Sequence, residues 1–203
     1  SWSTISNGHV EVGSAGYVNI STFEPMKPAQ KMHVGSVTKS VLAMGVLHLI
    51  FEERLTLDTN VESLLSELNF DNAWSDRSPI KVKNLLDHTS GLDNIRMWQL
   101  LSTKPLPNTP LEEAFESSQH NLLKIRTEPG TQYSYSNMGY TLLAMVIEAV
   151  TNERYEYFLD VNLLTPLEMH DSSFAFISQR GQFADPLLAM GYYENNVAQS
   201  AVP

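Results

Sequence analysis

The sequence of 203 residues contains no cysteine. That absence excludes a disulfide-bonded scaffold, a cysteine nucleophile and a metal site built from thiolates. A chain of this length can bury about 70% of the surface that its unfolded form exposes, so it needs no disulfide or metal to hold it together. If the protein uses a hydroxyl or thiol nucleophile, serine is therefore the residue to look for.

Basic residues are also few. Lysine and arginine together number 13, against 23 aspartates and glutamates, which leaves a formal net charge of −10. The basic residues are scattered along the chain, whereas a nucleic-acid-binding protein usually concentrates them in a stripe or patch. We therefore expect no nucleic-acid partner.

Long hydrophobic runs are missing as well. The longest apolar stretch, 41–51, includes His48 and is too short to cross a bilayer, so the sequence predicts no transmembrane segment. Residues 1–4 lack the basic start and the apolar core of a signal peptide.

The six histidines are not spaced as zinc ligands, and we expect neither a metal nor another cofactor. The Gly-x-Ser-x-Gly motif of α/β-hydrolases does not occur.

The hydrophobic pattern predicts a small sheet followed mainly by helices. Residues 9–22 alternate partly and contain valine, tyrosine and isoleucine, which favours one or two strands around a glycine turn. Residues 36–52 contain no proline and are apolar on nearly all sides, which predicts a helix that is buried on all sides. Further helices or helical turns are expected at 61–68, 82–87, 96–101, 111–124, 137–150 and 155–164.

Lys39 is the only Lys, Arg, Asp or Glu between Lys31 and Glu52. A lysine inside an apolar helix destabilises the fold unless it is paired or neutral. Ser36 lies one helical turn earlier and on the same face, so the lysine could accept the proton of the serine hydroxyl. The start of a helix also offers free N–H groups that suit a developing oxyanion. The alternative is a serine that caps the helix and a lysine that extends to the surface.

A second polar segment, residues 133–137, follows the turn at 129–130 and precedes an apolar helix. Tyr135 and Asn137 alternate with Ser136, so in an extended segment their side chains point the same way. A tyrosine near a lysine can have a lowered pKa and act as a base. The alternative is an ordinary loop in which Asn137 caps the following helix.

Together these segments resemble the serine β-lactamase and penicillin-binding protein superfamily, in particular its branch of class C β-lactamases, D,D-peptidases and esterases. Residues 36–39 resemble its Ser-x-x-Lys motif, and residues 135–137 resemble its Tyr-x-Asn motif. Residues 85–92 resemble a Leu-Leu-x-His-Thr-Ser-Gly-Leu stretch that this branch often carries. The segments 129–130 and 164–169 also fit in order and spacing.

The resemblance implies a role for each matching residue. Ser36 would attack a carbonyl and become acylated, and its backbone N–H would be one donor to the oxyanion. Lys39 and Tyr135 would share the proton transfers, and which of them is the base stays open. Asn137 would hold the amide of the substrate. His88 suggests a catalytic triad, but in this family its stretch lies on a structural turn.

The implied fold is α/β (α+β) and β-lactamase-like, with a small antiparallel sheet packed with helices and a mostly helical domain. Residues 1–58 would form the first part of the α/β domain with the nucleophile helix, and residues 59–203 the helical domain with the Tyr-Ser-Asn motif. No Lys-Thr-Gly, Lys-Ser-Gly or His-x-Gly motif follows Tyr135. In the family that motif lies on a later strand, which supplies the second oxyanion donor. We therefore expect a domain cut at both ends, with weak or no activity by itself.

The implied function is a serine hydrolase that forms an acyl-enzyme on an amide or ester, with β-lactams or D-Ala-D-Ala-type peptides as the leading substrates. Two alternatives stay open: a non-catalytic penicillin-binding or sensing module, and a carboxylesterase on the same fold. The expected partner is a small-molecule or peptide substrate, and the exposed edges of an incomplete sheet favour self-association. The family suggests a periplasmic or extracellular location, although the chain carries no targeting signal.

Overall fold

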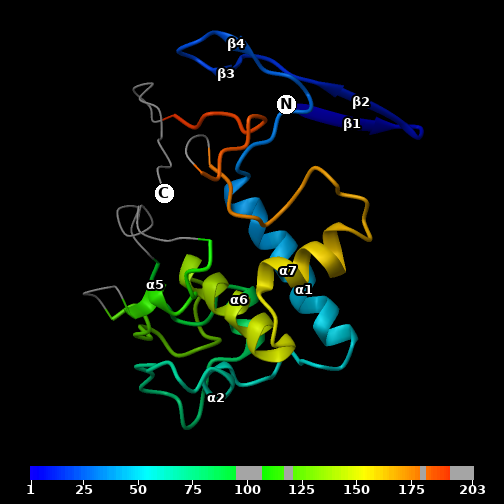
Figure 1. Ribbon diagram of the computed structural model, residues 1–203. Coiled ribbons are helices and arrows are strands. Elements are labelled where there is room, and N and C mark those ends of the chain that lie inside the picture. The colour runs from blue at the N-terminus through cyan, green and yellow to red at the C-terminus, as the bar shows by residue number, and fades with distance from the viewer. Residues whose placement is uncertain (95–106, 117–120, 179–181, 193–203) are drawn as a thin grey trace. The chain divides into compact units, whose positions relative to one another are not determined.

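The computed structural model describes residues 1–94, 107–116, 121–178 and 182–192. The chain divides into two compact units (Figure 1). One comprises Ser1–Gly35, Thr103–Pro107 and Ala175–Pro203, and the other comprises Ser36–Ser102 and Asn108–Phe174. The division into 1–58 and 59–203 that the sequence suggested stays a prediction.

The first unit contains two small antiparallel sheets. Strand β1 (Trp2–Ser6) pairs with β2 (His9–Gly13), and β3 (Tyr17–Asn19) pairs with β4 (Glu24–Pro25). Asn7 and Gly8 connect β1 to β2 with φ values of 50° and 79°, as a two-residue hairpin turn of this twist requires. Strands within 9–22 are therefore confirmed, and the structure adds β1 and β4.

The two ends of the first unit are tied together by hydrogen bonds. The backbone of Lys31 bridges to that of Leu188, and the Lys31 ammonium lies 3.0 Å from the Asp185 carboxylate. The backbone N–H of Leu187, and then Lys31, lower the pKa of Asp185 below its ordinary value. Segments more than 150 residues apart in sequence therefore share one unit.

The second unit is helical. Helix α1 (Thr38–Phe51) follows a short 3-10 turn, η1 (Gly35–Val37), and packs against α6 (Asn137–Thr151) and α7 (Tyr155–Leu159), as Figure 1 shows. The short helix α3 (Val82–Leu86) also packs against α6. The remaining described elements of this unit are α2 (Val61–Leu64), α5 (Glu113–Glu116) and the π-helical η2 (Asp160–Leu164). Of the helices in the described ranges, none is both long and apolar enough to cross a membrane.

Only one face of α1 is buried. That face carries Leu42, Gly45, Val46 and Leu49, which follow the i, i+3, i+4, i+7 spacing of an amphipathic helix. On the other side, the side chains of Leu47 and Phe51 are 52% and 87% exposed. The prediction of a helix buried on all sides is therefore wrong, because α6 and α7 cover a single stripe.

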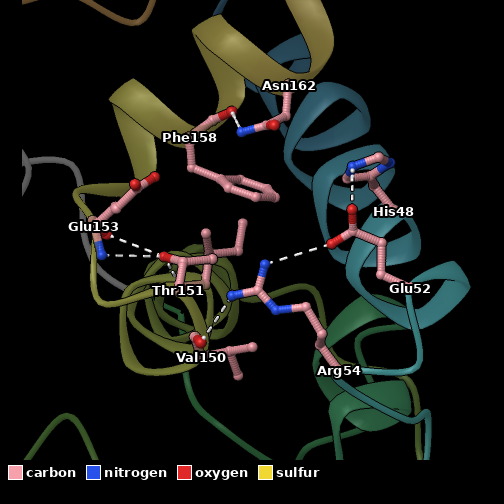
Figure 2. Close-up of polar contacts among 9 residues, drawn as sticks. His48, Glu52, Arg54, Val150, Thr151, Glu153, Phe158 and Asn162 are labelled. Carbon is pink, nitrogen blue, oxygen red and sulfur yellow. Dashed lines mark hydrogen bonds and ion pairs between the residues drawn. The ribbon is translucent and has the colours of Figure 1, made fainter.

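The chain that leaves α1 is anchored to the end of α6 (Figure 2). The Arg54 guanidinium donates to the carbonyl of Val150 at 3.0 Å and lies 3.4 Å from the Glu52 carboxylate. Glu52 in turn lies 3.4 Å from His48, one turn back on α1. The last carbonyls of a helix have no partner within the helix, and Arg54 satisfies one of them.

The expected helix at 111–124 is wrong at residues 121–124, which are not helical, while residues 117–120 lie outside the described ranges. Helix α5 covers only Glu113–Glu116, while Lys124 and Ile125 form isolated β-bridges with Asp71 and Leu92. At these residues, backbone hydrogen bonds to segments distant in sequence are therefore formed in place of the helix that the local hydrophobic pattern favours. The helical turn expected at 96–101 lies outside the described residues, whereas the expected helix at 137–150 is confirmed as α6.

Gly91 holds the loop after α3 close to the segment 125–127. Its φ is +77°, and a Cβ atom there would lie 2.1 Å from the carbonyl oxygen of Thr127. The Gly91 carbonyl also accepts from the N–H of Arg126 at 2.8 Å. Both the backbone angle and the contact therefore require glycine.

We expect Gly91→Ala to lower the free energy of unfolding by about 1–3 kcal/mol or more, because the added methyl group overpacks against backbone. Gly139→Ala is the matched control, since a Cβ there has its nearest neighbour at 3.7 Å. In the helix this control should change stability by no more than about 1 kcal/mol, in the favourable direction. Urea denaturation of both variants measures the difference, and equal stabilities would contradict the account of Gly91.

Candidate active site

Ser36 and Lys39 lie at the start of α1. Ser36 is in the η1 turn and is exposed, and Lys39 lies in the first turn of the α-helix and is half-buried. The Lys39 ammonium is 3.4 Å from the Ser36 hydroxyl. The N-cap residue of α1 is Val37, and no side chain caps the helix there. The alternative of a capping serine at position 36 is therefore wrong.

Tyr135 and Asn137 lie at the start of α6. Ser136 between them is extended, and its hydroxyl accepts from the N–H of Gly139, which makes Ser136 the N-cap of α6. The same hydroxyl donates to the carbonyl of Asp93 at 3.0 Å. Asn137 is therefore the first residue of α6 and does not cap it, so its side chain is available for other contacts.

The four predicted site residues meet in one hydrogen-bonded cluster. The Ser36 hydroxyl is 2.8 Å from the Tyr135 hydroxyl, and the Lys39 ammonium donates to the Asn137 side-chain carbonyl at 2.6 Å. The pairs Ser36–Tyr135 and Lys39–Asn137 are 99 and 98 residues apart in sequence. The ammonium also lies 5.1 Å from the ring centre of Tyr135 and 5.7 Å from that of Tyr140.

This arrangement changes the acidity of the tyrosines in opposite directions. The Lys39 side chain, followed by the Ser36 hydroxyl, lowers the pKa of Tyr135. Both favour the phenolate, because a cation and a hydrogen-bond donor stabilise negative charge. Burial, and then the neighbouring Tyr135, raise the pKa of Tyr140. Tyr135 is therefore the tyrosine of this pair that suits proton transfer.

The sequence reasoning did not single out Asn94. Its side-chain carbonyl accepts from the backbone N–H of Asn137 at 3.0 Å and from the Asn137 side-chain amide at 3.1 Å. These contacts orient the Asn137 amide so that its oxygen faces Lys39. Asn94 follows the matched stretch 85–92 by two residues, and no spacing rule marks it.

His88 lies in the turn that follows α3, where the family resemblance placed it. Its Nδ1 accepts from the N–H of Ser136 at 3.2 Å, and its ring lies 4.5 Å from that of Tyr135. Because Nδ1 accepts this bond, the proton of the neutral ring lies on Nε2, which therefore cannot take a proton from serine as the base of a catalytic triad does. Within the ranges that the structure describes, no group of three or more His, Asp or Glu side chains could hold a metal ion.

Comparison with known proteins agrees with this geometry. The profile of the Beta-lactamase family matches residues 2–185. The chain belongs to the β-lactamase family. The resemblance inferred from the motifs at 36–39 and 135–137 is therefore confirmed.

Three relatives illustrate the likeness. Protein flp of Staphylococcus aureus (strain N315) is 28% identical over 172 residues, which cover 84% of this chain and 33% of that protein. The octameric penicillin-binding protein homologue from Pyrococcus abyssi is 27% identical with a TM-score of 0.75, over 98% of this chain and 45% of that one. The D-amino acid amidase from Ochrobactrum anthropi SV3, complexed with D-phenylalanine, is 25% identical with a TM-score of 0.69, over 88% and 46%.

The chain thus spans about a third of the length of the curated relative flp and less than half of either solved chain. The likeness to the solved chains confirms the β-lactamase-like fold expected from the sequence.

Ultraviolet titration of tyrosinate tests the electrostatics of the cluster. We expect Tyr135→Phe to remove the ionisation at the lowest pH, because Lys39 and Ser36 lower the pKa of Tyr135 while burial raises that of Tyr155 to about 12. Lys39→Met should move the same ionisation up toward the ordinary value of about 10. Lys124→Met is the control, because its ammonium lies 3.7 Å from Asp71, outside the cluster. An unchanged first ionisation in Lys39→Met would show that Lys39 does not act on Tyr135.

Proposed function

We propose that the protein is a serine hydrolase in which Ser36 attacks the carbonyl carbon of an amide or ester and forms an acyl-enzyme. The observation that carries the proposal is the 2.8 Å contact between the hydroxyls of Ser36 and Tyr135, next to the Lys39 ammonium. A serine hydroxyl becomes a good nucleophile when a base within hydrogen-bond reach accepts its proton. Membership of the β-lactamase family supports the same chemistry.

Tyr135 is the immediate base in this proposal. It lies closer to the Ser36 hydroxyl, at 2.8 Å, than Lys39 does, at 3.4 Å. As the Ser36 oxygen bonds to the carbonyl carbon, its proton passes to the Tyr135 phenolate. The tyrosine then gives that proton to the leaving nitrogen or oxygen, whose bond to carbon breaks. Lys39 keeps its charge and stabilises the phenolate.

Hydrolysis of the acyl-enzyme follows the same path in reverse. A water molecule attacks the ester carbon, Tyr135 takes the proton of the water, and the proton returns to the Ser36 oxygen as the ester bond breaks. The backbone N–H of Ser36, at the start of a helix, donates to the oxyanion in both steps. No metal or other cofactor takes part in this scheme.

Asn137 holds the substrate. An asparagine amide has two N–H donors. One of them donates to Asn94 at 3.1 Å, and the side-chain oxygen accepts from Lys39 at 2.6 Å. The second N–H is the group that would bind a substrate carbonyl. This role requires the orientation that Asn94 imposes.

The leading substrates are β-lactams and D-Ala-D-Ala-type peptides, both of which present an amide carbonyl to the nucleophile. The relatives include a penicillin-binding protein homologue and a D-amino acid amidase, whose names support an amide substrate. The second candidate is a penicillin-binding module without turnover. The name of the Pyrococcus abyssi relative, a penicillin-binding protein homologue, supports penicillin binding. A carboxylesterase and a periplasmic or extracellular location stay predictions.

Covalent labelling tests the proposal on the protein as the cell makes it. We expect a fluorescent penicillin to acylate Ser36, which mass spectrometry of the labelled peptide identifies. Ser36→Ala should abolish labelling, whereas Ser40→Ala, one turn further along the same helix, should not change it. Tyr135→Phe should slow acylation by about 10²-fold or more, because a positioned base contributes roughly that much.

The outcomes separate the candidates. Labelling at another residue, or no labelling of a folded protein, would reject Ser36 as the nucleophile. A stable adduct that is never released would favour the binding module over the hydrolase. The ratio of kcat/KM on nitrocefin to that on a short nitrophenyl ester would rank amide against ester substrates.

A further inference from the structure

His88 contacts the backbone on both sides of Tyr135. Its carbonyl accepts from the N–H of Ser134 at 2.8 Å, and its side-chain Nδ1 accepts from the N–H of Ser136 at 3.2 Å. Tyr135 is therefore held between two N–H groups that are both bound by one residue. The backbone of His88 is in the left-handed region, with φ at +61°, which is uncommon for a residue other than glycine.

The imidazole ring of His88 also contacts three tyrosine rings. Its centre lies 4.5 Å from that of Tyr135, at an interplanar angle of 35°, and 5.2 Å from that of Tyr140. The ring of Tyr133 meets it edge-on at 5.8 Å. The ring of Tyr135 therefore packs on the same side chain that accepts from the N–H of the next residue, Ser136, so both the ring and the adjoining backbone are restrained.

This contact requires one form of the imidazole. A ring nitrogen accepts a hydrogen bond only when it carries no proton, so Nδ1 must be bare and the proton must lie on Nε2. A doubly protonated ring would present a donor to the Ser136 N–H and break the bond. The charged and titratable groups that face the ring are Lys39 from α1, Asp87 from the same turn, Tyr133 and Tyr135 from the segment before α6, and Tyr140 from α6.

We infer that His88, in its neutral form with the proton on Nε2, is a positioning residue that keeps the Tyr135 hydroxyl on Ser36. The inference rests on the proposed function for its effect on catalysis, but the positioning itself does not need that function. Burial, followed by the charge of Lys39, lowers the pKa of His88, which agrees with the neutral form at neutral pH. The acceptor is the part of the side chain that the positioning requires, and the ring adds a packing contact with Tyr135.

Two substitutions separate the ring from the acceptor. His88→Asn keeps an acceptor close to the position of Nδ1, and asparagine tolerates the left-handed backbone. His88→Phe keeps a flat ring and removes the acceptor. His170→Phe, at an exposed histidine in the same unit, is the control for adding a phenylalanine.

The first readout is the tyrosinate titration, which needs no activity. We expect His88→Phe to move the lowest tyrosine ionisation up toward pH 10, because Tyr135 leaves the neighbourhood of Lys39 and Ser36. His88→Asn and His170→Phe should leave it in place. An unmoved ionisation in His88→Phe would overturn the inference, whatever the fate of the proposed hydrolase function.

The second readout is the rate of acylation by a penicillin in the protein as the cell makes it. We expect His88→Phe to reduce the acylation rate constant at least about tenfold with little change in the binding step, because small misplacements of a base cost rate. His88→Asn should restore most of that rate. In a profile of the acylation rate against pH, it should also remove the loss of rate at low pH that protonation of His88 causes. Equal rates in the two variants would overturn the inference. Absence of acylation in all proteins, together with the expected titration, would reject only the proposed function.

The third readout needs no variant, so it tests the inference even if His88→Phe fails to fold. Nitrogen NMR of the unmodified protein distinguishes a bare Nδ1 from a protonated one. We expect His88 at neutral pH to show a bare, hydrogen-bonded Nδ1 and a proton on Nε2. A proton on Nδ1 would overturn the inference without any substitution.

Discussion

The packing of α1 against α6 is the constraint on which the candidate active site depends. The two helices are held together at both ends, by the 2.6 Å contact of Lys39 with Asn137 at their starts and by the 3.0 Å bond from Arg54 to Val150 at their ends. Between these points the buried face of α1 includes Gly45, where a Cβ atom would lie 2.3 Å from Leu159. The side chain of Leu159 on α7 therefore lies directly against the backbone of α1.

Because the starts of α1 and α6 coincide, their electrostatic effects add. Each helix carries partial positive charge at its N-terminus, and these helices are 14 and 15 residues long. That charge acts in the same direction as the Lys39 ammonium, which lowers the pKa of Tyr135. The ammonium itself is balanced by the oxygen of Asn137 and by the faces of two tyrosine rings. The same arrangement therefore stabilises a half-buried cation and favours ionisation of Tyr135.

The loop that follows α3 supports the cluster without belonging to it. His88, Asp93 and Asn94 bind the backbone or side chains of residues 134–137, and Gly91 lets the loop lie against the carbonyl of Thr127. Each of these contacts joins residues more than 35 positions apart in sequence. The geometry of Tyr135 and Asn137 is consequently set by a loop that has no regular secondary structure of its own.

Local patterns in the sequence were sufficient for part of this structure. The unbroken apolar run at 137–150 predicted α6, and a single lysine in an apolar segment marked Lys39 as unusual, because helical periodicity and the cost of a buried charge are local properties. The order of Ser36, Lys39, Tyr135 and Asn137 along the chain was enough to indicate the family, which the match over residues 2–185 confirms.

Other features depended on partners that no local pattern reveals. Lys124, the last residue of the expected helix, instead forms a bridge with Asp71, and the adjoining Ile125 forms one with Leu92. The apolar face of α1 around Phe51 is exposed. Asn94 and His88 acquire their roles only from contacts 43 and 48 residues away. The sequence by itself determined which side chains are available for chemistry and which segments form the long helices. Only the tertiary structure decided which atoms face one another, because those distances are set by long-range packing and backbone hydrogen bonds.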